Sequence, residues 1–352
     1  MKYTIAICSL LCLSMGCQKN AGEARWSTRQ DSVIQPGSPV LQQAPLPQIK
    51  VLDESIRVSA IDLLVQASYS DDALLRANAI EGLQPVDDQI DEVVRRGMVD
   101  SNQGVRFVAV MTVGLRELCG LSHLVRPMLK DSSSSVRAAA MYALERCGAD
   151  VDLTPLAAMV LGPDPTEKAN AAFVLGEIGN PTAIPLIRNG VGRRMSNVET
   201  ARLQTIDLVM AEAMVKLGDD SERQVIRAAL FSPSERSELM AMACQMLGRN
   251  RDAMMAQNLQ TLATGSGPRQ PGLEIQLLAC DALAKIDPER VPVDLVLAST
   301  THERPEIRAQ AAIVLGNLDS ARYGTQLLLL LKDEDPRVQV AAAAAALRNN
   351  PS

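Results

Sequence analysis

The chain has 352 residues, of which 47% are hydrophobic and only 2% aromatic, and it carries 35 Lys and Arg against 41 Asp and Glu. An apolar content of alanine, leucine and methionine favours closely packed helices over a β sandwich, so the composition predicts an all-α fold. The net charge of −6 comes without a basic stripe, which argues against a nucleic-acid partner because such partners require clustered basic residues.

Residues 1–16 predict a signal peptide, because Lys2 precedes an apolar run that is shorter than the about 20 residues of a membrane-spanning helix. Gly16-Cys17 resembles the end of a bacterial lipobox, although Ser14 stands where that pattern usually has leucine. The resemblance implies a lipid on Cys17 and an exported bacterial lipoprotein, anchored to a membrane on its periplasmic or cell-surface side. An ordinary cleaved signal or a plain apolar N-terminus is the alternative.

Residues 17–50 predict a disordered tether that follows the lipidated cysteine. The segment is rich in Pro, Gln, Ser and Gly and has no apolar periodicity, so it cannot repay the conformational entropy of folding. A coil of this length reaches on the order of 30 Å. Trp26 is the single tryptophan, and it is either an anchor at the lipid interface or an incidental apolar residue.

Residues 51–352 repeat the pattern of SSVRAAAMYALERCG at positions 134–148. We take as a marker the residue seven positions after the arginine of this stretch. Equivalent markers recur 30 to 32 residues apart, except for two spacings of 39, at Leu83, Val113, Leu144, Leu175, Met214, Cys244, Leu283, Leu315 and Ala346. Each unit contains an amphipathic first helix, a polar loop that supplies an N-cap, and an alanine-rich second helix.

The repeated pattern D-x-x-x-x-V-R-x-x-A-A-x-x-L-G is similar to HEAT repeats of the short phycobilisome-lyase type. The stretches DSSSSVRAAAMYAL, RPEIRAQAAIVLGNL and EKANAAFVLGEIGN carry the resemblance best. It implies an α-solenoid of about nine HEAT-like helical hairpins. It does not specify a function, because many roles have been built on solenoid surfaces.

A cation recurs in the first turn of the second helix, at Arg76, Arg106, Arg137, Lys168 and Arg308. The resemblance implies that each cation reaches the loop acid of an adjacent unit and forms a structural ladder along the stack. The alternative is an anion-binding ladder. It would be interrupted by the residues Asp207, Ser237, Gln276 and Gln339.

Two sets of residues are candidates for partner binding. The first set lies two positions before the marker and predicts an apolar groove on the concave side, at Met111, Tyr142, Phe173, Met242 and Ile313. Such a groove would suit a partner helix or a lipid, unless these side chains pad against the next second helix. The second set lies in the two enlarged units, whose extra residues 190–197 and 264–272 contain Arg193, Arg194 and Arg269. These loops either contact an acidic partner or are tolerated insertions.

Catalytic arrangements are scarce, and neither a cofactor nor a metal site is expected. The chain has two histidines, His123 and His302, and neither has the spacing of a zinc site. His302-Glu303 resembles the metal-binding pairs of deoxyhypusine hydroxylase, a di-iron enzyme of similar repeats that needs several such pairs. Cys147, Cys244 and Cys280 lie at predicted core positions, and Cys119 could pair with Cys147 in an exported protein.

These patterns predict a non-enzymatic, membrane-tethered scaffold that binds another protein through the solenoid surface. Two alternatives remain. One is an enzyme related to bilin lyases or to the di-iron hydroxylase, and the other is a carrier that holds a lipid or ligand in the apolar groove.

Overall fold

The computed structural model describes residues 49–192, 198–267, 270–320 and 322–348. Within these ranges the regular elements are α-helices and short 3-10 turns, without a strand, which confirms the predicted all-α fold. The first helices of the nine units are α2 (Ile49–Ala67), α4 (Asp87–Met98), α6 (Ser122–Val125), α8 (Thr154–Leu161), α10 (Ile184–Gly190), α12 (Arg223–Ala229), α14 (Ala256–Thr264), α16 (Val293–Ser299) and α18 (Gly324–Leu330). The second helices are α3 (Ala73–Gly82), α5 (Gln103–Arg116), α7 (Ser134–Arg146), α9 (Pro165–Ile178), α11 (Thr200–Lys216), α13 (Ser237–Arg249), α15 (Leu273–Ile286), α17 (Pro305–Asp319) and α19 (Pro336–Ala346).

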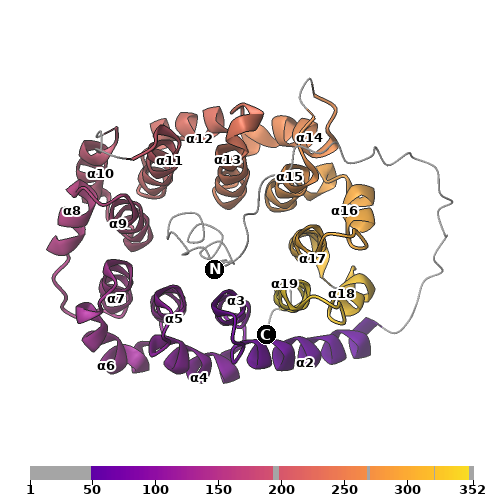
Figure 1. Cartoon of the computed structure of the whole chain (residues 1–352), viewed down its shortest axis with the longest axis horizontal. Coiled ribbons are helices and arrows are strands. Elements are labelled where there is room, and N and C mark those ends of the chain that lie inside the picture. The colour runs from indigo at the N-terminus through magenta and orange to yellow at the C-terminus, as the bar shows by residue number, and fades with distance from the viewer. Residues whose placement is uncertain (1–48, 193–197, 268–269, 321, 349–352) are drawn as a thin grey trace.

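The helical hairpins form two concentric layers (Figure 1). The second helices form the inner layer and the first helices the outer layer, so that each unit contributes one helix to each. The loops that lead from an outer to an inner helix lie together at one edge of this wall, which we call the ladder edge. The loops that lead on to the next unit form the opposite edge. The predicted solenoid is therefore confirmed.

The solenoid closes on itself into an elongated ring, a feature that the sequence did not predict. The last helix, α19, packs against both α2 and α3 of the first unit (Figure 1). The approach is close, because a Cβ added at Gly82 of α3 would lie 3.1 Å from the Cβ of Ala344 in α19. The first and last units therefore bury each other's apolar faces. In an open solenoid, each of these two units would instead need a polar outer face.

Small residues allow the inner helices to approach each other. A Cβ at Gly316 in α17 would lie 2.7 Å from the Cα of Ala345 in α19. Real Cβ atoms essentially never come that near, so the helices would have to move apart. The alanine-rich second helices are buried along most of their length, and the low aromatic content of the chain is the composition that such close packing requires.

Side chains of the polar loops cap several inner helices, as the repeat pattern predicts. Asp335 accepts a hydrogen bond from the backbone N–H of Arg337 (2.8 Å), and Asn102 accepts one from Gly104 (2.8 Å). Such caps satisfy N–H groups that have no partner inside the helix. Ser133 occupies the N-cap of α7 without a side-chain capping bond, so the cap predicted from DSSSSVR does not form.

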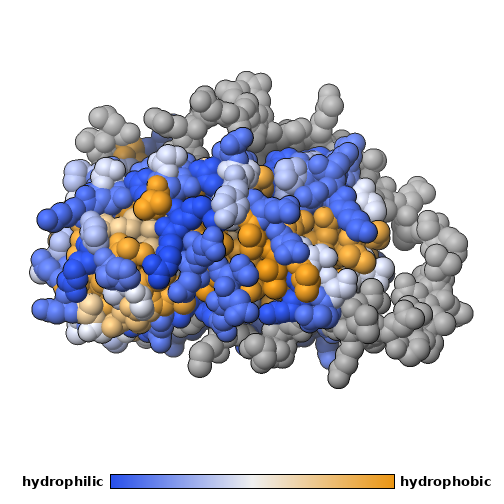
Figure 2. Space-filling view, turned by 90° about the horizontal axis from the view of Figure 1, so that it is seen from below, coloured by the Kyte–Doolittle hydropathy of each residue, from blue (hydrophilic) through white to orange (hydrophobic). Residues whose placement is uncertain are grey.

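The outer wall on the side of α2 and α4 carries apolar patches separated by polar side chains (Figure 2). Val58 of α2 is one exposed apolar residue, with half of its surface accessible. Within the described ranges, no helix combines the length and the hydropathy needed to cross a membrane.

Candidate functional site

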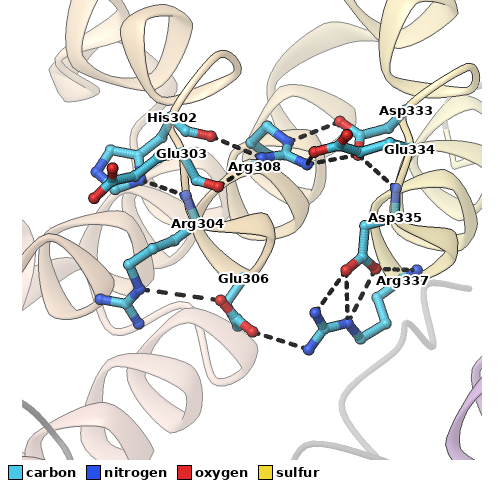
Figure 3. Close-up of polar contacts among 9 residues, drawn as sticks. All are labelled: His302, Glu303, Arg304, Glu306, Arg308, Asp333, Glu334, Asp335 and Arg337. Atoms are coloured by element: carbon cyan, nitrogen blue, oxygen red, sulfur yellow. Dashed lines mark hydrogen bonds and ion pairs between the residues drawn. The ribbon is translucent and has the colours of Figure 1, made fainter.

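Three arginines of the predicted ladder hold an acid of the following unit in one shared geometry. Arg76 donates from Nε to Oδ2 of Asp100 and from Nη2 to Oδ1, both at 2.7 Å. Arg106 makes the same pair of bonds to Asp131 at 2.9 Å. Arg308 makes them to Asp333 at 2.7 Å (Figure 3). The acids lie in the loops that precede α5, α7 and α19, so each pair joins two neighbouring units.

Each of these acids also accepts a hydrogen bond from the backbone N–H two residues further along. The donors are Asn102 (2.8 Å), Ser133 (2.8 Å) and Asp335 (2.9 Å), and in each case the acceptor is the Oδ1 atom that also binds Nη2. One carboxylate is thus held by three N–H groups, two from a planar guanidinium and one from the main chain. Bidentate, charge-assisted bonds of this kind are the strong ones.

The electrostatics of the ladder favour the charged forms. The hydrogen bond from Arg308 lowers the pKa of Asp333 below its usual value. At Asp131 burial raises the pKa, but the hydrogen bonds from Arg106 and from the Ser133 N–H outweigh it, so the net shift is downward. The side chain of Arg308 is 9% exposed and that of Asp333 is 10% exposed, so solvent screens these pairs much less than a surface ion pair.

Two predicted ladder cations depart from this geometry. Arg137 donates from Nη1 to the carbonyl oxygens of Asp131 (2.8 Å) and Ser132 (3.2 Å) in its own loop, but it bonds to no acid among the described residues. Lys168 is buried, and its Nζ donates to the carbonyl oxygen of Gly190 at 3.3 Å. Arg137 therefore anchors its own loop, whereas Lys168 reaches the start of the first enlarged loop.

Sequence reasoning missed several other ion pairs between units, including those of Arg227 and Arg337. Arg227, at the end of α12, binds Asp252 through Nε (2.7 Å) and Nη2 (3.0 Å). Arg227 lies in an outer helix, whereas the ladder cations lie in the first turn of inner helices. The repeat pattern therefore did not predict this pair. On the ladder edge, Arg337 binds Glu306 at 2.9 Å and so joins α19 to α17 (Figure 3).

Three acids lie at the same position of the inner helices as the proposed apolar groove, two residues before the marker. They are Glu81, Glu212 and Asp281, and all three are buried. Arg249 binds Glu212 through Nε (3.0 Å) and Nη2 (2.8 Å), which joins α13 to α11. Burial lowers the pKa of Arg348 to about 10, against the opposing effect of Asp281 and Glu81. The charge of Arg348, in the last unit, thus interacts with Glu81 of the first unit across the ring closure.

The exposed apolar groove predicted from the sequence does not form. Met111, Tyr142 and Met242 are at most 2% exposed, and Phe173 and Ile313 are only partly exposed. The reason is the close approach of the inner helices: a Cβ at Gly114 of α5 would lie 2.5 Å from Cε1 of Tyr142 in α7. This position therefore packs against the neighbouring inner helix, which was the alternative interpretation of the pattern.

The arginines of the two enlarged loops, Arg193, Arg194 and Arg269, lie outside the described residues, as does Cys17. Both enlargements fall between an outer and an inner helix in the chain, and their described residues lie on the ladder edge. The first one begins with a defined contact, because the backbone N–H of Gly192 donates to Oδ1 of Asp207 at 3.1 Å. Asp207 occupies a ladder position, where it accepts a bond from its own loop instead of donating one as the ladder cations do.

Cys119 and Cys147 are joined by a disulfide bond between the C-terminal ends of α5 and α7, with a Cα–Cα distance of 5.3 Å. The sequence left this pairing open. Cys244 and Cys280 are free and buried, and burial raises the pKa of the Cys280 thiol to about 12. Both therefore carry a protonated, unreactive thiol at neutral pH.

The two histidines make local contacts. Nδ1 of His302 accepts a hydrogen bond from the backbone N–H of Arg304 at 3.1 Å (Figure 3). Nδ1 of His123 lies 2.9 Å from the carbonyl oxygen of Gly120. The part of the chain that the structure describes contains no group of three or more His, Cys, Asp or Glu side chains placed to hold a metal ion.

Comparison with known families supports a HEAT-repeat protein. The family described as HEAT repeats matches residues 269–348, and the family described as PBS lyase HEAT-like repeat matches residues 168–192. No curated protein matches the chain at a significant level.

Several solved structures match the chain at low identity. The complex of CpcE and CpcF of phycocyanin lyase from Nostoc sp. PCC7120 is 16% identical, with a TM-score of 0.40, over 84% of this chain and 100% of that chain. Human deoxyhypusine hydroxylase in complex with glycerol is 16% identical, with a TM-score of 0.33, over 73% of this chain and 95% of that chain. An engineered protein is 19% identical, with a TM-score of 0.32, over 82% and 87% of the two chains. At these values the likeness supports no inference about activity.

Proposed function

We propose that this chain is a non-enzymatic scaffold that binds another protein through the ladder edge of its ring. The scaffold is exported and is tethered to a membrane by a lipid on Cys17. The ring supplies a rigid wall, and the loops along the ladder edge supply the contact surface.

The observation that carries this proposal is the presence of three strongly exposed apolar side chains on the ladder edge, although Met254 and Leu329 are exposed to a similar extent elsewhere on the ring. Tyr69 is 60% exposed, Val99 is 81% exposed and Phe231 is 54% exposed. All three lie in loops that lead from an outer to an inner helix, which places them on the ladder edge. Exposed apolar residues gathered on one edge are typical of a protein interface, whereas single scattered ones need no explanation.

Tyr69 also has the character of an interface anchor. The guanidinium of Arg96 lies 3.5 Å from the centre of the Tyr69 ring, and it donates a hydrogen bond to the hydroxyl of Ser68. Stacking on a neighbouring arginine holds the ring in place and so reduces the entropy that a partner would have to remove. Tyrosine and arginine are the residue types that contribute most often to binding energy at interfaces.

The disulfide between Cys119 and Cys147 supports export. Such bonds persist in oxidising compartments and are rare in the cytosol. The anchor itself is testable: Cys17→Ser should abolish fatty-acid labelling and release the protein from the membrane fraction. Unchanged labelling of the variant would refute lipidation at this residue.

The two alternatives have less support. A lipid or ligand carrier loses its proposed groove, because the side chains that would line it are buried or partly buried. An enzyme related to the di-iron hydroxylase would need several His-Glu pairs, and the chain has one, at His302-Glu303.

Site-specific photo-cross-linking in intact membranes tests the proposed contact surface. A photoreactive amino acid at Val99 should capture a protein that mass spectrometry can identify. The matched control is Met254, which is 75% exposed but lies in the loop between α13 and α14 on the opposite edge. Equal capture from both positions, or none from Val99, would contradict binding through the ladder edge.

A further inference from the structure

One position of the arginine ladder has its cation but lacks its acid. Asp131 and Asp333 stand 25 residues after Arg106 and Arg308, and Asp100 stands 24 residues after Arg76. The residue 25 positions after Arg137 is Gly162. Its backbone is extended, with φ −70° and ψ 173°, close to the φ −58° and ψ 148° of Asp131. The loop before α9 therefore follows the usual path but carries no carboxylate.

The guanidinium of Arg137 is nevertheless held as in the occupied positions. Its Nη1 donates to the carbonyl oxygens five and six residues before it, at 3.2 and 2.8 Å. Arg106 makes the same two bonds at 3.1 and 2.9 Å, and Arg308 makes them at 3.0 and 2.9 Å. Because Nη1 is fixed in this way, Nε and Nη2 of Arg137 face the place where the other arginines hold an acid.

The third donor of the acid position is also present and unused. In the occupied positions it is the backbone N–H two residues after the acid, and here it is the N–H of Asp164. Among the described residues, neither this N–H nor Nε and Nη2 of Arg137 has a hydrogen-bond partner. We call these three donors the Arg137 fork.

We propose that the Arg137 fork binds the carboxylate of an aspartate or glutamate side chain from the partner protein. One oxygen of the incoming carboxylate would accept a hydrogen bond from Nε, and the other would accept hydrogen bonds from Nη2 and from the Asp164 N–H. Asp131 accepts the equivalent three bonds from Arg106 and from the Ser133 N–H. Two parallel N–H groups match the planar carboxylate better than a spherical anion. The inference rests on the proposed function only for the source of this carboxylate.

The carboxylate of Asp164, next to the fork, is engaged in capping a helix. The side chain of Asp164 caps α9 by accepting from the backbone N–H groups of Thr166 and Glu167, both at 2.8 Å. Asp335 caps α19 beside the occupied position of Asp333 by accepting from the backbone N–H of Arg337, and the side chain of Arg337 pairs with it as well. An acidic N-cap is therefore compatible with a carboxylate in the fork.

The location of the fork fits the proposed interface. Arg137 is partly exposed and lies on the ladder edge, one unit after the loop that carries Val99. A single acidic side chain of a partner could enter the fork while neighbouring apolar groups cover Val99. The partner would then complete the ladder, and its other contacts would supply most of the affinity.

Nuclear magnetic resonance of the full-length protein tests the fork directly. The arginine Nε–Hε signals and the Asp164 amide are followed during titration with a capped Gly-Asp-Gly peptide at constant ionic strength. We expect saturable shifts of the Arg137 and Asp164 signals. The matched capped Gly-Asn-Gly peptide, which has the same shape without the charge, should bind at least tenfold more weakly.

Arg137→Gln is the informative variant, because glutamine is native at the same position of the last unit. There Gln339 donates from Nε2 to the carbonyl oxygen of Asp333 at 2.6 Å, so glutamine keeps the loop bond and removes the fork. The variant should lose the peptide response while it retains the melting temperature. Arg308→Gln is the control and should retain the response, since Asp333 already occupies the corresponding donors of Arg308 and this pair does not contact Arg137.

Three outcomes would overturn the inference: no saturable shift, equal shifts with both peptides, or an unchanged response in Arg137→Gln. Failure of the proposed function is a separate result. If the Asp peptide binds through Arg137 but photo-cross-linking at Val99 captures nothing, the carboxylate site stands and the proposed interface does not.

Discussion

The ladder predicts a large difference in stability between two variants that look equivalent in sequence. Arg106→Gln removes both bonds to Asp131, whose side chain is 12% exposed. The carboxylate would keep the Ser133 N–H and lose its countercharge. Breaking a fully buried ion pair costs about 3–5 kcal/mol, and surface pairs contribute about 0–1 kcal/mol. For this mostly buried pair we expect Arg106→Gln to lower the free energy of unfolding by about 2 kcal/mol.

Arg137→Gln should cost less than about 0.5 kcal/mol, the range of surface substitutions that break no structural feature. Arg137 makes no ion pair among the described residues, and its loop bonds can be replaced by the glutamine amide as at Gln339. Urea unfolding of both variants, followed by circular dichroism, measures the two changes. Equal losses of stability would refute the distinction between occupied and vacant ladder positions.

Three further predictions concern the wall of the ring. Tyr142→Ser should lower the free energy of unfolding by about 3–5 kcal/mol, because the side chain is 2% exposed. A melting temperature close to that of the native chain would instead support the exposed groove. Replacing Cys119 and Cys147 by serine opens a closed loop with a sequence separation of 28 and should cost about 3–4 kcal/mol. Melting with and without reductant checks this, since a native chain that melts equally in both conditions would lack the bond. The folded-state pKa of Asp333 is lowered by Arg308, so its contribution to stability is full above the unfolded pKa of about 4 and is lost as the pH falls through the folded value. Acid unfolding of Arg308→Gln should therefore show a shallower loss of stability below about pH 5 than unfolding of the native chain.

The sequence predicts the units of this fold well, and it predicts their closure poorly. Markers 30 to 32 residues apart, with two spacings of 39, locate all nine inner helices, because the apolar period and the capping residues are local properties. Ring closure depends on the small rotation between each unit and the next, added over all units. No single stretch of the sequence indicates this total rotation. The contact of Gly82 with Ala344 joins residues from the two ends of the chain, and no repeat pattern indicates it.

In the candidate site, too, the sequence predicts the features set by the repeat pattern, but not those set by the distance between helices. The pairing of Arg76, Arg106 and Arg308 with loop acids follows from the repeat register, and the absence of an acid at Gly162 can be read from the same alignment. The groove prediction was wrong because helical periodicity does not give the distance between neighbouring helices. Glycines such as Gly114 bring those helices together and bury the position of Tyr142.

The measurement that tests the account most directly compares partner capture by two triple variants in membranes. Replacement of Tyr69, Val99 and Phe231 by serine removes the exposed apolar side chains of the ladder edge. Replacement of Val58, Val225 and Met254, which are 50%, 42% and 75% exposed elsewhere on the ring, is the matched control. We predict that the first variant melts like the native protein and loses capture, while the control retains capture. Retained capture in the ladder-edge variant, or equal loss in both, would contradict a scaffold that binds its partner through this edge.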